Sequence, residues 1–340
     1  MVRTEASLGE WKGLYEVSTR IKALEPWKQF GDMDIIGIQT GEEEENTVFY
    51  SILGQAGDCY GIVVYEGYEA FNSLLMLFMQ EKLNLSVEYT MFHQRNLTCY
   101  WGNREELSDK QRKVIKDLGY QYRGKNQWLY FMSYEPGYYP YMTDHEEVLR
   151  MTEHLENLEM ALHYYKNMDI DVDFEHGNMF SMVFAEDKKT WQYGEAPLPF
   201  TGFQPGVLEI TNETLLKSLE KVPKSEMILE VEIASLGGAV SDKTYKKPVN
   251  PDLCILIEAR TGMILKCEMQ PPEAESALSL AKELVDFMFQ AGVPKEIRVS
   301  NVIVESVLRQ ICDTCQIKLR RVKQLPGVSE FMQQMKRFSS

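Results

Sequence analysis

The stretch LCILIEARTGMILKCEM, residues 253–269, sets the pattern for the last third of the chain. Two apolar runs flank the segment ARTG, whose glycine permits a tight turn. This pattern predicts two antiparallel strands joined by a hairpin. A single carboxylate, Glu258, ends the first run. It is either a metal-binding acid or the last residue of a buried strand.

Helices and strands alternate after this hairpin. Strands that are separated by helices imply parallel pairing through right-handed crossovers. We therefore expect residues 207–340 to form an α/β domain with a mixed sheet. Its expected elements after the hairpin are a helix at 271–292, a strand at 296–300, a helix at 301–315, a strand at 317–322 and a helix at 328–338.

Residues 1–166 mix strands and helices in a less regular order, which indicates one α+β domain. Its longest predicted helix begins near a capping box of Thr143 and Glu146. Residues 167–206 contain a predicted strand pair and then a proline-rich segment, which we interpret as a domain junction. The expected fold is thus α+β with two domains.

Composition restricts the class of protein. Apolar residues make up 44% and charged residues 26% of the 340 residues, which is typical of a globular chain. The longest apolar run, LLMLFM at 74–79, is far shorter than the roughly 20 residues of a membrane-spanning helix. The polar N-terminus and six scattered cysteines favour a reducing cytoplasm, with no disulfide framework.

The net charge of −15 repels nucleic acids and anionic membranes. The charge is partly segregated, because residues 291–340 hold nine Lys or Arg and four acidic residues. We interpret this basic end as a solvated face. Nucleic acid and membrane are therefore not the expected partners.

Three passages are distinctive: GQAGDCYGIVVYEG at 54–67, YRGKNQWLYFMSYEPGYYP at 122–140, and LPG at 325–327. With these passages the chain resembles an uncharacterised family of bacterial proteins, mostly from Firmicutes, in which two domains of unknown function stand in tandem. The resemblance implies a cytoplasmic bacterial protein. It carries no activity.

From residue 252 onward, the order of elements is similar to the ribonuclease H-like core of integrases and transposases. These enzymes place acids on the first strand, after the fourth strand and on a late helix, where together they hold two divalent metals. Here Glu258 stands near the first position and Glu330 could supply the third, whereas Ser300 and Asn301 stand at the second.

The resemblance therefore implies the fold without its chemistry, with no metal or cofactor and with Glu258 and Glu330 as weak catalytic candidates. One strand of this core is not evident, unless MILEVEIA at 227–234 provides it. In that segment Glu230 and Glu232 share one strand face. They could bind a cation, but we interpret them as a solvated face.

Residues 122–142 have the most unusual composition in the chain. Cations, an amide and aromatic rings gather there, as in grooves that bind a peptide or stack a ring. The alternative is a strand whose aromatic side chains fill the core. The candidate ligand-binding residues are Arg123, Lys125, Asn126, Trp128, Tyr134 and Tyr138.

Other catalytic patterns are weaker. Cys312 and Cys315 have redox spacing, but they lie near the end of a predicted helix and not at its N-terminus, so buried thiols are favoured. A Ser–His–acid arrangement stays open, because such residues meet only in the fold.

The sequence does not establish a function, and whether the protein is an enzyme stays open. We expect a non-catalytic binding or adaptor protein that uses residues 122–142 to bind a protein or peptide partner. The alternative is a metal-dependent nucleic-acid-processing enzyme on the C-terminal domain. A third possibility is a structural partner in an oligomer.

Overall fold

The computed structural model describes residues 4–168, 170–185, 187–240, 244–245 and 247–339. They fall into two compact units, each built from three chain segments. The first unit contains Met1–Leu75, Gln94–Glu135 and Pro140–Gly202, and the second contains Met76–His93, Pro136–Tyr139 and Phe203–Ser340. This α+β architecture with two units agrees with the fold class expected from the sequence.

The first unit is built on an eight-stranded sheet with the order β6-β5-β4-β3-β2-β1-β7-β8. Neighbouring strands are antiparallel except β1 and β7, which pair in parallel. The strands are β1 (Ile36–Gln39), β2 (Val48–Leu53), β3 (Tyr60–Glu66), β4 (Asn96–Gly102), β5 (Trp128–Tyr134), β6 (Tyr141–Met142), β7 (Asn178–Ala185) and β8 (Thr190–Pro197).

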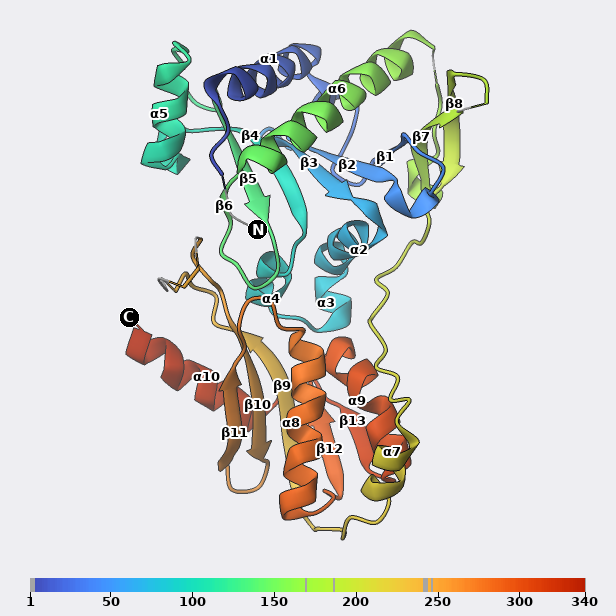
Figure 1. Ribbon diagram of the computed structural model, residues 1–340, viewed down its shortest axis with the longest axis vertical. Coiled ribbons are helices and arrows are strands. Elements are labelled where there is room, and N and C mark those ends of the chain that lie inside the picture. The colour runs from blue at the N-terminus through green and yellow to red at the C-terminus, as the bar shows by residue number, and fades with distance from the viewer. Residues whose placement is uncertain (1–3, 169, 186, 241–243, 246, 340) are drawn as a thin grey trace. The chain divides into compact units, whose positions relative to one another are not determined.

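Two long helices, α1 (Leu8–Leu24) and α6 (His145–Asn167), cover one face of this sheet (Figure 1). Helix α6 begins one residue later than the sequence suggested. Its capping box consists of Asp144 and Glu147 and not of Thr143 and Glu146, because the Asp144 side chain accepts the Glu147 amide. The shorter helices are α2 (Gly67–Phe78), α5 (Asp109–Asp117) and the 3-10 turns η1 (Pro26–Lys28), η2 (Glu44–Asn46), η3 (Arg104–Glu106) and η4 (Phe174–His176).

The second unit is built on a five-stranded sheet with the order β11-β10-β9-β12-β13. Its strands are β9 (Ile228–Ser235), β10 (Asp252–Glu258), β11 (Ile264–Met269), β12 (Glu296–Val299) and β13 (Lys318–Arg321). Strands β9, β10 and β11 are antiparallel, whereas β12 pairs in parallel with both β9 and β13. The expected mixed sheet is confirmed.

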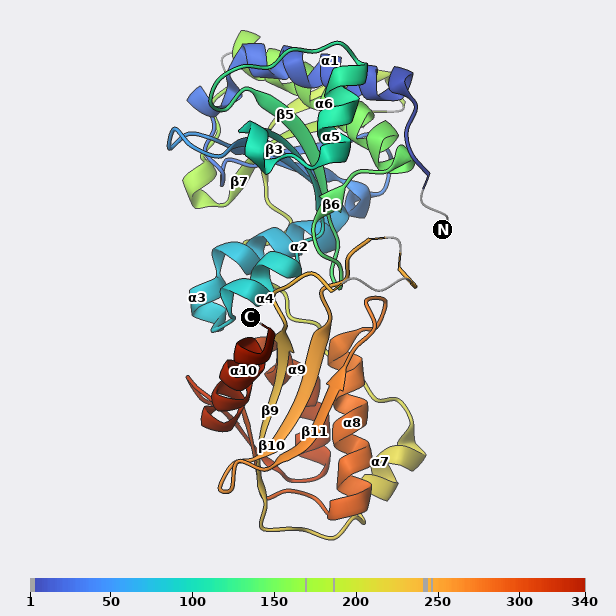
Figure 2. The same cartoon turned by 90° about the vertical axis from the view of Figure 1, so that its left-hand side faces the viewer.

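Strand β9 shows that MILEVEIA, residues 227–234, provides the strand that was otherwise missing from the predicted core. It makes β10 the second strand of the meander, so Glu258 does not lie on the first strand as the sequence suggested. Residues Leu229, Val231 and Ile233 pack into the core below α8 (Ser276–Ala291) and α9 (Val302–Thr314). The opposite face of β10 packs against α10 (Pro326–Ser339) (Figure 2).

The remaining helices of the second unit are α3 (Gln80–Leu83), α4 (Val87–Phe92) and α7 (Glu213–Leu219). The structure divides the chain differently from the sequence-based boundaries. The strand pair β7–β8, placed in a junction at 167–206, extends the sheet of the first unit through β1. Conversely, residues 76–93 add apolar side chains to the core of the second unit. In the part of the chain described, no helix is long and apolar enough to cross a membrane.

Candidate functional site

The first unit contains a cavity of about 820 Å³ between η3, α5 and the segment that leads into β5. This volume lies in the range of small-molecule and cofactor sites. Charge dominates its wall, with five cations against two carboxylates. The lining residues include the cations Arg104, Arg112, Lys113, Lys116 and Arg123, the acids Asp109 and Asp117, and the aromatics Tyr120, Tyr122 and Trp128.

Helix α5 positions three of the five cations. Its N-terminus is closed by a capping box of Ser108 and Gln111, and Gln111 also anchors the helix by donating to the Phe131 carbonyl oxygen at 3.1 Å. Arg112 pairs with Asp109 at 2.5 Å, which lowers the pKa of that carboxyl. Among the described side chains, neither Lys113 nor Lys116 forms an ion pair.

Aromatic rings form the opposite wall. Tyr120 stacks on Tyr122 with centroids 5.8 Å apart, and Tyr122 meets Trp128 edge to face at 6.1 Å. The Arg104 guanidinium lies 5.9 Å from the Trp128 ring centroid, within cation–π range. The row is anchored in the core because Tyr120 also stacks on the buried Tyr15. Rigid ring faces and cations therefore face the same space.

Two of the six residues predicted from the 122–142 stretch, Arg123 and Trp128, line this cavity. Asn126 is a turn residue in the left-handed region (φ 56°), and its amide donates to Asn103 Oδ1 at 3.2 Å. Lys125 precedes it in the same turn.

The other two predicted residues lie elsewhere. The Tyr134 hydroxyl is 3.1 Å from that of Tyr100, at the opposite end of β5. Tyr138 belongs to the second unit, where its hydroxyl donates to Glu273 at 2.6 Å and Lys247 lies over its ring. The six residues therefore do not form one site.

The sequence interpretation missed the cations of η3 and α5. A signal was present in SDKQRKVIKDLG, residues 108–119, where basic residues recur through a short helix. Only the fold shows that this helix lies beside the aromatic stretch.

The acids of β9 are not a solvated face, as the sequence suggested. Glu230 and Glu232 are both buried beneath the α10 side of the sheet. Glu232 accepts hydrogen bonds from the Ser300 hydroxyl, from Asn301 Nδ2 at 2.6 Å and from the Ile233 amide at 3.0 Å. Burial outweighs these bonds and raises the pKa of Glu232 to about 7. Glu230 accepts the Val328 amide of α10 at 3.1 Å.

Glu258 ends β10, and its Oε2 atom holds the hairpin turn. It accepts the amides of Arg260 and Thr261 at 3.0 and 2.8 Å and the Thr261 hydroxyl at 2.9 Å. Glu330 lies on the exposed side of α10, where Gln334 Nε2 is 3.4 Å away. Within the residues that the structure describes, no group of three or more His, Cys, Asp and Glu side chains could hold a metal ion.

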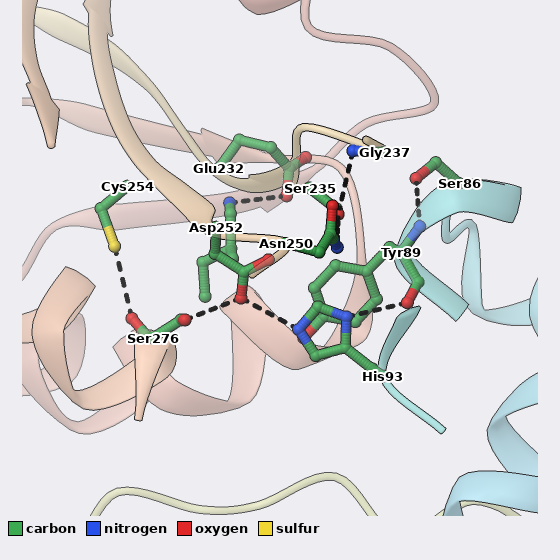
Figure 3. A network of polar contacts seen from close by, with 11 residues as sticks. Ser86, Tyr89, His93, Glu232, Ser235, Gly237, Asn250, Asp252, Cys254 and Ser276 are labelled. Carbon is green, nitrogen blue, oxygen red and sulfur yellow. Dashed lines mark hydrogen bonds and ion pairs between the residues drawn. The ribbon is translucent and has the colours of Figure 1, made fainter. Parts of the chain in front are cut away.

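A polar network in the second unit brings a serine, a histidine and an acid together (Figure 3). Asp252 Oδ2 accepts the Ser276 hydroxyl at 2.7 Å and lies 2.9 Å from His93 Nε2. In a nucleophilic triad the imidazole stands between the hydroxyl and the carboxylate. Here the carboxylate stands in the middle, so the network joins α4, β10 and α8 without activating the serine. Nearby, burial raises the pKa of the Cys254 thiol to about 12.

Comparison with protein families gives two matches. Residues 11–182 match the family described as Domain of unknown function (DUF7309). The chain belongs to this family. Residues 215–336 match a second model, Domain of unknown function (DUF6930). The expected tandem of two domains of unknown function is thereby confirmed. The DUF7309 match includes residues 76–93 and 136–139, which the structure places in the second unit.

No curated protein matches the chain. Among solved structures, the catalytic core domain of HTLV-2 integrase with magnesium, in a dimeric form, is 14% identical with a TM-score of 0.22. The match covers 30% of this chain and 62% of that one. The simian T-cell lymphotropic virus intasome with the PP2A regulatory subunit B56 gamma is 12% identical with a TM-score of 0.25, over 33% of this chain and 42% of that one. Likeness at these scores carries no functional argument.

Proposed function

We propose that this DUF7309 protein is a non-catalytic binding or adaptor protein whose first unit binds an acidic peptide segment of a partner protein. The observation that carries this proposal is the cavity between α5 and the aromatic row. Five cations line it, although the whole chain has a net charge of −15.

Both walls of the cavity fit such a segment. Hydrogen bonds between cationic side chains and carboxylates are stronger than those between neutral groups. Lys113 and Lys116 lack an ion-pair partner in the described part of the chain, so both could bind carboxylates of the peptide. Tyr122 and Trp128 offer ring faces for apolar or aromatic side chains of the same peptide. The acidity of the rest of the chain is screened beyond about 8 Å at physiological salt, whereas the cations act at contact.

Selection from a library of short random peptides tests this function. We expect the protein to enrich peptides that combine Asp or Glu with an aromatic residue. Lys113→Glu should lose this enrichment, because it reverses a charge on the cavity wall. Lys110→Glu makes the same change on the same helix outside the lining and should keep it. Enrichment of neutral or basic peptides would contradict the proposal.

A second candidate is a metal-dependent nucleic-acid-processing enzyme on the second unit, and the strand order of its sheet favours this candidate. Strand β9, the first strand of this sheet along the chain, carries Glu232, which would have to release Ser300 and Asn301 to bind a metal. Calorimetric titration of Mg²⁺ and Mn²⁺ tests this function. Binding that is lost in Glu232→Gln or Glu258→Ala would support it, and the absence of binding would remove it.

The proposal includes a bacterial cytoplasm as the site of action. None of the six cysteines forms a disulfide, which fits a reducing compartment. Cell fractionation with an antibody against the protein tests this part separately.

A further inference from the structure

The two edges of the five-stranded sheet differ in chemistry. Strand β13 forms one edge of the sheet and exposes Lys318, Arg320 and Arg321. Charged side chains on an edge strand oppose its pairing with another strand. Strand β11 ends the other side (Figure 1) and leaves Ile264 and Met269 about half exposed. An exposed apolar edge strand is a template for a further strand.

The backbone of β11 also has free hydrogen-bonding groups. The Gln270 amide donates to the Asp252 carbonyl oxygen at 2.8 Å, and Leu253 stands opposite Met269. Hydrogen-bonded and non-bonded residue pairs alternate in an antiparallel ladder. The backbone groups of Glu268 therefore bond to β10, and those of Cys267 do not. The N–H and C=O groups of Cys267 and Met269 therefore point to the open side, where β11 has no neighbouring strand among the described residues.

The side chains of β11 are divided between the two sheet faces. In the strand register, Glu268 stands opposite Cys254 and Lys266 stands opposite Leu256. Cys254 and Leu256 pack toward α8, so Glu268 and Lys266 lie on the same face of the sheet. Lys266 Nζ accordingly lies 3.0 Å from Glu283 of α8 and 3.6 Å from Glu268. Cys267, opposite Ile255, lies on the α10 face and is exposed. The edge thus carries one cation and one anion, two residues apart on the same face.

We propose that β11 pairs antiparallel with β11 of a second copy of this chain, with the two-fold axis at Cys267. This register places Lys266 opposite Glu268 of the other copy, and Glu268 opposite its Lys266. An axis at Lys266 or at Glu268 would place like charges opposite one another, which destabilises a strand pair. The contact is isologous, so it closes at two copies and joins their sheets into one.

Charge reversal tests the partner and the register together. Lys266→Glu places Glu against Glu in the pair, and Glu268→Lys places Lys against Lys. In sedimentation velocity, we expect the unaltered chain to be a dimer and each variant alone to dissociate at least about tenfold more readily. A mixture of the two variants restores both opposite-charge pairs and should dimerise again. Recovery in the mixture also shows that both variants fold.

A second pair of variants tests the backbone. Cys267→Pro removes an N–H group that points to the open side, so it should abolish the dimer and leave the circular dichroism spectrum unchanged. Cys267→Ser keeps the N–H group and should remain dimeric. A monomeric unaltered chain, a mixture that stays monomeric, or a dimeric Cys267→Pro would each overturn the proposal.

Discussion

At the scale of single residues, the second unit uses its acids to satisfy donors. Glu258 holds the hairpin turn, Glu230 accepts an amide at the start of α10, and Glu232 accepts Ser300 and Asn301. Asn301 also caps α9 through its Oδ1 atom. These contacts account for acids that the sequence offered as a cation site or a solvated face.

The alternation of β9 predicted that Glu230 and Glu232 share a face, and the structure agrees. It could not predict that α10 would cover that face, because strand periodicity shows which residues lie together and not what packs above them. The same limit applies to the cavity. Trp128, Tyr122 and Arg123 follow from local composition, but four of the five cations come from η3 and α5, earlier in the chain.

Glu232 makes stability depend on pH in a specific direction. Its pKa is about 7 in the folded protein against an ordinary value of 4.5, because burial disfavours the charged form. Between these values the folded state binds more protons than the unfolded chain, so stability falls as pH rises from about 4.5 to 7 and is then constant.

Glu232→Gln should remove this slope. The amide is neutral at every pH, so the variant should exceed the unaltered protein in unfolding free energy by about 3 kcal/mol above pH 7. The two proteins should be equal near pH 4.5. All five tryptophans belong to the first unit, so tryptophan fluorescence would not report on the unfolding of the second unit. Urea unfolding is therefore followed by circular dichroism. Parallel pH profiles for the two proteins would refute the assignment.

At the scale of elements, local signals predicted the hairpin at 253–269. The LPG motif illustrates what such signals do not supply. Pro326 begins α10, Leu325 enters the small core below it, and Gly327 lets the helix approach the sheet. A Cβ atom at Gly327 would lie 2.9 Å from Ile257 Cγ2 and 3.0 Å from Glu230 Oε2.

Gly327→Ala should therefore push α10 away from β9 and β10. We expect a loss of about 1–3 kcal/mol of stability in the second unit and faster hydrogen exchange in α10. Gly206→Ala is the matched control, because a Cβ there meets nothing within 4 Å. Unchanged exchange in α10 would show that the close approach does not matter.

At the scale of the whole molecule, each unit is assembled from separated parts of the chain. The apolar pattern within one segment does not reveal which core the segment joins. Residues Met76, Leu83, Leu85 and Tyr89 belong to the core of the second unit. Asn84 Nδ2 also donates to the Ser300 carbonyl oxygen at 2.8 Å.

A fragment of residues 203–340 should consequently be unstable alone. Burial of an apolar side chain contributes about 1.5–3 kcal/mol, so losing these four removes much of the stability of an ordinary domain. A synthetic peptide of residues 76–93 should restore cooperative unfolding, measured by circular dichroism. The same peptide with Leu83→Ala and Leu85→Ala is the control. A fragment that unfolds cooperatively alone would contradict this assembly.

The proposed binding function is tested most directly by fluorescence anisotropy with a labelled peptide of alternating Glu and Tyr. Its control probe replaces each Glu with Gln. We predict that the protein binds the acidic probe and not the neutral one, that Lys113→Glu weakens binding at least about tenfold, and that Lys110→Glu leaves it unchanged. Equal binding of both probes, or equal loss in both variants, would contradict the assignment of the cavity as an acidic-peptide site.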